Sequence, residues 1–505
     1  MKLRKYILAG LATLAFITLA GCGSNAAADE ETPDTFIFAQ TAGPVGLSPT
    51  FTNDSSSSQV FTFIYDTLFD QTNGEFIPRL ATGFENPDEN TWVINLREGV
   101  EFHDGTPFNS EAVKYTFELL TNPETAAPRA SLLQPITSIE TPDDYTVILK
   151  TKQPFGSMLA ALSHPNAAII SPVASENQNL MEEPVGTGPF VFYSRADGRI
   201  VLHRNDNYWD GPVAIERAEF KVVPAMDTAI SMLQTGQVNF LFGVTSDSIP
   251  RIQGIENVTF ETREGSGVNY VVFNTNRGLA QDLLFRETFA KAIDTVSLVN
   301  ALEGAAHGSN GFIGPHVFGY NEAIENFGIN FDLEAARKAV VANGFDQEEI
   351  SILTTNTPIY QRKAEIIQAQ LTNAGFNVRI DTLEWATYLD VARNGEFDIA
   401  LAAWGNLTQD GSELLFPRLH SENIGSSNQG HYHSPELDAL IDASRQTIDQ
   451  EKRLAILQEA NEYVLTQLPV IPLFHGTVNM AMGSGLRNVT LNPNTLWNIH
   501  SASFE

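Results

Sequence analysis

The hydrophobic positions between residues 350 and 403 change regularly between the period of a strand and the period of a helix. We expect strands at 350–354, 376–380 and 397–403, with helices at 358–373 and 385–393 between them. The first helix begins with Pro358, and the two helices stop before Gly375 and Gly395. Strand, helix, strand, helix and strand joined by short links predict a parallel α/β sheet.

The rest of the chain gives shorter patterns. A turn-rich link is expected at 99–108, after which Asn109 or Ser110 caps a helix. A further helix, the longest expected here, should end before Gly304. The expected strands are 35–39, 91–96, 188–193, 200–204, 218–223 and 270–274, and the expected helices are 61–69, 111–120, 230–236 and 283–302.

The amino end reads as an export signal. Three basic residues among the first five precede an apolar run at 6–20, which is too short and too early for a structural membrane span. The tetrapeptide 19–22 (LAGC) resembles the lipobox of bacterial lipoproteins and ends in Cys22, the single cysteine of the chain. We therefore expect a signal peptide at 1–21, a lipid anchor on Cys22 and a flexible tether at 22–33. The alternative is a buried cysteine close to an ordinary cleavage site.

Size and charge limit the partners. The chain has 505 residues, of which 43% are hydrophobic, so two or three compact units are expected. With 30 basic and 61 acidic residues, the net charge is −31, which repels nucleic acid and anionic lipid headgroups. The lipid anchor should be the only contact with the membrane. The negative field either gathers cationic ligands or serves solubility in salty or alkaline surroundings.

Enzymatic motifs are mostly missing. The sequence contains no phosphate-binding loop, no nucleophile elbow and no H-E-x-x-H zinc motif, and His103-Asp104 lies in a turn sequence. The best metal candidates are His431 and His433, whose side chains would point to the same side of a strand; His420 lies upstream of them. The alternative is a solvated or hydrogen-bonded histidine pair. We expect no cofactor and no catalytic residues.

Several stretches together resemble the extracytoplasmic solute-binding proteins of ABC importers, in the class that binds peptides or nickel chelates. The most specific is 96–108 (LREGVEFHDGTPF). Others are 186–190 (GTGPF), 205–209 (NDNYW), 233–239 (LQTGQVN), 285–294 (FRETFAKAID), 395–399 (GEFDI), 434–438 (SPELD) and 468–473 (LPVIPL). The resemblance covers essentially the whole chain after the signal, in the family's order.

This resemblance implies an α/β protein with two lobes that close over a ligand about a hinge, in the large class with an inserted subdomain. Lobe I would hold 34–270 and 478–505, with the subdomain at about 71–185, and lobe II would hold 271–477. The hinge strands would lie near 269–274 and 474–480. No bond would be made or broken in the cleft.

The resemblance also suggests ligand-binding residues. Loops at the carboxyl ends of parallel strands face the crevice of an α/β sheet, so the segment 404–410 should face the cleft. Related dipeptide and glutathione binders carry a tryptophan and an aspartate at the spacing of Trp404 and Asp410, where the aspartate pairs with the α-amino group of the ligand. Arg362 is the candidate partner for the carboxylate. The alternatives are core packing for Trp404, a solvated acid for Asp410 and a solvent-facing cation for Arg362.

The leading hypothesis is a monomeric lipoprotein on the outer face of the cell membrane. It would capture short peptides, including glutathione-like ones, and deliver them to an ABC permease. A nickel-chelate or metallophore binder of the same fold is the second hypothesis, and an exported hydrolase is a remote third.

Overall fold

One large mixed sheet connects the two lobes. The computed structural model describes residues 34–72, 75–302 and 306–505, and the sheet formed by these residues has eleven strands. β13 (Ala306–His307) pairs at the side with one long strand of this sheet. In spatial order the other strands are β15 (Asn377–Leu383), β14 (Glu349–Thr355), β16 (Ile399–Trp404), β12 (Thr259–Phe273), β17 (Val470–Met482), β11 (Phe240–Phe242), β1 (Thr35–Gln40), β10 (Arg217–Val222), β9 (Arg199–Arg204) and β8 (Phe190–Ala196).

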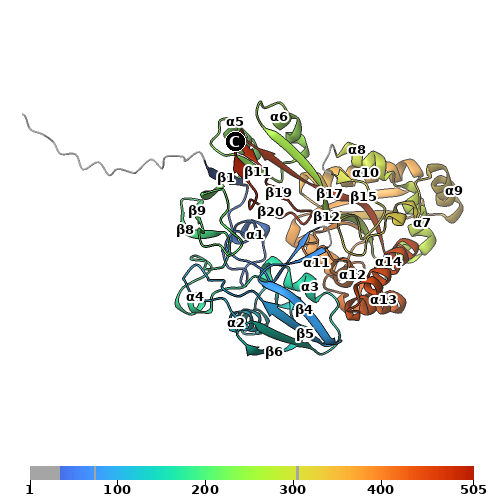
Figure 1. Ribbon diagram of the computed structural model, residues 1–505. Helices are drawn as coiled ribbons and strands as arrows, with labels where there is room; N and C mark the ends of the chain where they lie inside the picture. The colour runs from blue at the N-terminus through green and yellow to red at the C-terminus, as the bar shows by residue number, and fades with distance from the viewer. Residues whose placement is uncertain (1–33, 73–74, 303–305) are drawn as a thin grey trace, which may run out of the picture. The chain divides into compact units, whose positions relative to one another are not determined.

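The long strands β12 and β17 join the two halves of this sheet. They pair antiparallel from Thr259↔Met482 to Val272↔Val470 and run side by side through the centre of Figure 1. The register shifts between Glu264 and Val268, where the sequence is Gly-Ser-Gly. The two-lobed α/β fold is confirmed. The predicted lobe boundaries fall inside β12 and β17 and remain a prediction.

The βαβαβ region has the predicted order. β14 pairs parallel with both β15 and β16, as the sequence pattern indicated. The helices between them end at Gly375 and Gly395, both in the left-handed conformation that glycine adopts without steric cost. The helices of this half are α7 (Leu283–Ala292), α8 (Thr295–Ala301), α9 (Leu333–Asn343), α10 (Pro358–Ala374), α11 (Trp385–Asn394), α12 (Gly411–Leu419), α13 (Pro435–Gln446) and α14 (Gln450–Gln467).

Helices cover both faces of this half of the sheet, since alternate strand residues enter different cores. Phe273, Ile352 and Leu401 pack with α7, α9 and α10. Tyr270 and Ala402 belong to the opposite core, which contains residues of α11, α12, α13 and α14. The loop that leaves β16 therefore leads directly into α12 on this second face.

Two helix predictions are corrected. The expected helix at 283–302 is two helices, because the Asp294 side chain accepts from the Ser297 amide and begins α8. The expected helix at 61–69 is wrong: α1 (Ser55–Phe61) lies earlier, over the serine tetrad, and is capped by Asp54. The bulky residues after Phe61 enter turns and the strand β2 (Phe69–Thr72), because burial outweighs their helical spacing.

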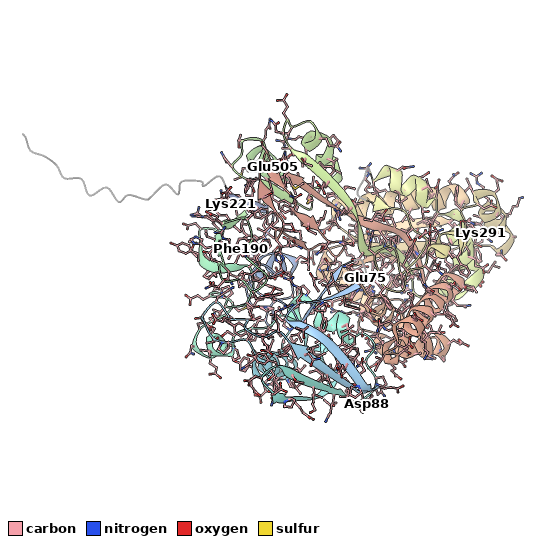
Figure 2. All side chains as sticks on the ribbon, in the orientation of Figure 1. Glu75, Asp88, Phe190, Lys221, Lys291 and Glu505 are labelled. Carbon is pink, nitrogen blue, oxygen red and sulfur yellow. The ribbon has the colours of Figure 1, made fainter. Side chains whose placement is uncertain are left out.

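A second sheet belongs to the predicted inserted subdomain. Its strand order is β4 (Ala81–Asp88), β5 (Thr91–Leu96), β7 (Thr146–Thr151) and β6 (Ile136–Asp143). Figure 1 shows it beside α2 (Ser110–Thr121), and Figure 2 shows Asp88 at the far end of its β4–β5 hairpin. Asn109 caps α2, in agreement with the sequence. The remaining helices and strands of this half are β3 (Glu75–Pro78), α3 (Met158–Leu162), α4 (Pro172–Asn177), α5 (Met226–Gln234), α6 (Ile249–Gln253), β18 (Leu486–Arg487), β19 (Thr490–Leu491), β20 (Trp497–Asn498) and β21 (Ser503–Phe504).

Candidate solute-binding cleft

Three distant parts of the chain enclose one cavity. It has about 800 Å³ of space free of atoms, including its open mouth. One wall comes from residues between Phe61 and Ala168, the second from Leu407 and Thr408, and the third from residues between Asn492 and His500. Leu407 and Thr408 lie in the loop that follows β16, so part of the segment predicted to face the cleft does so.

Asp66 is a structural acid in the cavity wall. Its two oxygens accept from the Thr187 hydroxyl at 3.0 Å, the Trp209 indole at 2.9 Å and the Tyr208 hydroxyl at 3.1 Å. The guanidinium of Arg79 lies 3.7 Å away, and Asp66 is 7% exposed. Every side of this carboxylate is occupied, so it holds the wall together and is closed to a ligand cation.

Asp70 differs from Asp66. It also lines the cavity, is half-buried, and accepts one hydrogen bond, from the Gln71 amide at 2.7 Å. Within the described ranges, no Lys, Arg or His nitrogen lies within ion-pair distance of its carboxylate. The His500 imidazole lines the same cavity; burial lowers its pKa, and Asp70 is among the acids that oppose this shift. Phe-Asp-Gln has no distinctive spacing, so the sequence pattern gave no sign of Asp70.

Gln409 connects the second wall to the first. Its carbonyl oxygen accepts a long hydrogen bond from the Gln71 side-chain amide at 3.5 Å and another from the Phe318 amide at 2.8 Å. Its backbone is left-handed, with φ of 49°, which a residue with a side chain rarely adopts. Neither polar atom of its buried side chain has a hydrogen-bond partner within 34–72, 75–302 and 306–505. Such a strained, unsatisfied residue beside a cavity is typical of functional sites.

Asp410 is the first predicted ligand contact, and it is 1% exposed at the start of α12. Arg453 binds both carboxylate oxygens, at 2.7 and 2.6 Å, and the Ser412 amide and hydroxyl donate to Oδ1 at 2.9 and 2.6 Å. Burial alone would raise the pKa of Asp410, but the Arg453 guanidinium and these hydrogen bonds hold the pKa below its usual value. The predicted contact with a ligand amine is not tested by this geometry, in which Arg453 occupies the carboxylate.

Trp404, the second predicted contact, is half-buried at the end of β16. Its indole nitrogen is buried and has no hydrogen-bond partner. The guanidinium carbon of Arg418 lies 5.1 Å from the centre of its ring. Its role in ligand binding stays a prediction.

Arg362, the third predicted contact, is exposed on α10. Its neighbour Lys363 is instead 2% exposed, and its ammonium donates to Asn269 at 2.8 Å and lies 3.6 Å from the centre of the Tyr360 ring. Burial lowers the pKa of Lys363 to about 7. The buried cation at this place in α10 is thus Lys363, while the ligand role of Arg362 stays a prediction.

The two candidate metal ligands, His431 and His433, form hydrogen bonds with different partners. The Nε2 atom of His431 lies 3.0 Å from the carbonyl oxygen of Arg393, and the Nδ1 atom of His433 lies 2.7 Å from the Ser421 hydroxyl. Among the described residues, no group of three or more His, Cys, Asp and Glu side chains is placed to hold a metal ion.

Cys22 and the predicted signal and tether lie outside the described residues. No helix of the described part is long and apolar enough to cross a bilayer.

These features define the class of protein: a two-lobed α/β solute-binding protein whose cleft is lined by both polar and apolar side chains. Residues 75–426 match the model of the bacterial extracellular solute-binding proteins, family 5, and the chain belongs to this family. It is therefore a binding protein of an ABC transport system and not an enzyme, as predicted.

The relatives and solved structures that match this chain cover nearly its whole length. Heme-binding protein A of Haemophilus influenzae is 26% identical, with 94% of each chain covered. The dipeptide-binding protein of Escherichia coli is 25% identical, over 91% of this chain and 92% of that one. The structure of HbpA2 from Haemophilus parasuis superimposes with a TM-score of 0.85 at 24% identity, over 93% of this chain and all of that one. A dipeptide-binding protein from Pseudoalteromonas, solved with Met-Leu, gives 0.77 at 24% identity, over 93% and 100%.

Proposed function

We propose that this protein captures short peptides outside the cell membrane and delivers them to an ABC permease. The observation that carries this proposal is the cavity between three parts of the chain, in whose wall Asp70 has no ion-pair partner among the described residues. Relatives named for dipeptides and for glutathione, at 25% identity over 91% of the chain, support the same solute class.

The α-amino group of the peptide is assigned to the cleft acids. Asp70 faces the cavity and can pair with an ammonium group without losing another ion pair. Asp410, the acid proposed from the sequence, would have to exchange Arg453 for the ligand. The two assignments differ in one respect: only Asp70 can bind an amine without rearranging a buried ion pair.

The protein acts from a lipid anchor on Cys22. A binding protein with one lipid-modified cysteine stays beside its permease, whereas a free one is diluted. We propose that the mature chain begins at Cys22 and works as a monomer on the outer face of the membrane.

Isothermal titration calorimetry tests the solute class. The ligand set is Ala-Ala, Ala-Ala-Ala, reduced glutathione, free histidine with and without Ni²⁺, and heme, the ligand that the Haemophilus relative is named for. Binding of at least one peptide, with the peptide recovered intact, is the expected result. Binding restricted to Ni²⁺-containing or heme samples contradicts the peptide assignment, and turnover of a peptide would contradict the transport role.

A further inference from the structure

Arg418 is a buried cation with no acidic partner among the described residues. Its side chain is at the end of α12 and is 7% exposed. One terminal nitrogen donates to the Gln429 side-chain oxygen at 2.8 Å, while its Nε has no acceptor. Throughout the part of the chain that the structure describes, no carboxylate oxygen lies within 4.0 Å of this guanidinium. In a protein with twice as many acidic as basic residues, this is an unusual arrangement.

Two further donors without acceptors lie beside this guanidinium. Its central carbon is 5.1 Å from the ring centre of Trp404 and 5.7 Å from that of Tyr270. In the described part of the chain, the buried Trp404 indole nitrogen has no hydrogen-bond partner, and the buried Tyr270 hydroxyl has no acceptor for its proton, because the neighbouring Arg418 can only donate to it. The nearby Tyr388 hydroxyl, in contrast, donates to the Leu401 carbonyl at 3.0 Å. Around Arg418, three side chains thus carry a buried donor without an acceptor in the described part of the chain, namely Arg418 itself, Trp404 and Tyr270.

The chemistry of these groups selects the ligand. Arginine, indole and phenol groups all donate hydrogen bonds, and an oxyanion accepts several such bonds at once. A buried guanidinium without an anion is strongly disfavoured, and the ion pair of Arg453 with Asp410 shows how this chain satisfies such a group elsewhere. The group that is missing around Arg418 is a hydrogen-bond acceptor that carries a negative charge.

We propose that Arg418, Tyr270 and Trp404 form a binding site for one anionic oxygen group, the carboxylate of the captured solute. The inference rests on the proposed function and adds to it a cation other than Arg362. Trp404 is half-buried and ends β16, so the cluster reaches the surface where the loop begins. Leu407 and Thr408 of the same loop line the cavity. A solute bound there can extend its carboxylate along the loop toward Trp404.

Calorimetry with matched ligands tests the site. Ala-Ala and its carboxy-terminal amide are titrated into the wild type, Arg418→Gln and the control Arg379→Gln, whose exposed arginine pairs with Glu349 and Asp381. We expect the wild type and the control to prefer the acid over the amide by at least about thirtyfold. Arg418→Gln should bind both equally, at the affinity of the wild type for the amide. A folded Arg418→Gln protein that keeps the full preference overturns the proposal.

A spectroscopic measurement keeps the test independent of that variant and of peptide binding. The chain has five tryptophans, so Trp404→Phe assigns the indole N–H signal of Trp404 in a ¹⁵N-labelled full chain. Ala-Ala, sodium acetate and inorganic phosphate should shift this signal, whereas the amide and matched sodium chloride should not. If no peptide binds but acetate shifts the signal, the proposed function fails and the anion site stands. If none of the three anions shifts it, the anion site is wrong, whatever the peptides do.

Discussion

Arg453 donates a hydrogen bond to each carboxylate oxygen of Asp410 in the core between α12 and α14, and each side chain is 1% exposed. The pair is the reason why an acid that resembles a ligand contact in sequence is engaged inside the protein. It also fixes the start of α12, since the same carboxylate caps that helix through Ser412.

Replacing Asp410 by Asn should destabilise the protein. Arg453 would keep its buried charge without an anion, and the free energy of unfolding should fall by about 3–5 kcal/mol. Urea denaturation of wild type and variant measures this change. Asp381→Asn, on the surface, is the control and should cost about 1 kcal/mol or less. Should Asp410→Asn keep wild-type stability and lose amine-bearing peptides, Asp410 is the ligand contact after all.

Asp70→Asn should weaken the binding of peptides that have a free amino terminus. One charge-assisted contact in a half-buried site is worth about 1.5 kcal/mol, or about tenfold in affinity. Calorimetry with Ala-Ala and its N-acetyl form checks this, since the variant should bind the two forms alike. Equal loss for both forms would show that Asp70 acts on the shape of the wall and not on the amine.

Lys363 should make stability depend on pH. Its pKa is about 7 in the folded protein and near 10.5 when unfolded, so the unfolded chain holds the extra proton between these values. Stability contributed by this group therefore rises with pH from about 7 to 10.5, by at most about 1.4 kcal/mol per pH unit. Below pH 7 both states carry the proton and the penalty of burying it is complete.

Lys363→Met removes this dependence while keeping the volume of the side chain. The difference in the free energy of unfolding between variant and wild type should favour the variant at pH 7 and shrink toward pH 10. Urea denaturation at four pH values measures it. A difference that does not change with pH would contradict the buried-charge explanation.

Gly156 should be needed for the close approach of its loop to the end of α13. Its amide donates to the Arg445 carbonyl at 2.6 Å, and a Cβ atom there would lie 2.1 Å from the Thr447 carbonyl oxygen. Gly156→Ala should favour the open clamp and lower ligand affinity by about tenfold. Small-angle scattering with and without ligand follows closure. Gly83→Ala, where a Cβ meets nothing within 4 Å, is the matched control; equal effects of the two variants would rule out a role of this contact.

Cys22→Ala should release the protein from membranes, because a signal without the modified cysteine leaves no hydrophobic anchor. Fractionation of cells with the wild type and the variant, followed by mass spectrometry of the mature amino terminus, checks both the anchor and the cleavage site. Persistent membrane association of the variant would contradict the lipid-anchor proposal.

The sequence alone determined what depends on local pattern. The period of hydrophobic positions, with proline at the start and glycine at the end of helices, gave the βαβαβ region and its parallel strands. Family motifs spread over the chain gave the two-lobed class. Both the hydrophobic period and the family motifs depend on residues that are close together in the sequence, so they can be recognised without the three-dimensional structure.

Only the tertiary structure decided how the charged residues are used. Asp410 and Arg453 are 43 positions apart and meet because α12 and α14 pack in one core. Asp66 accepts hydrogen bonds from residues more than 120 positions away, and Asp70, four positions on, has no ion-pair partner among the described residues. Lys363 and Arg418 are both buried, but Lys363 contacts Asn269 and Phe474, whereas Arg418 lies beside Tyr270 and Trp404. Whether two charged groups pair depends on the distance between them and on their burial in the folded protein, and the local sequence determines neither.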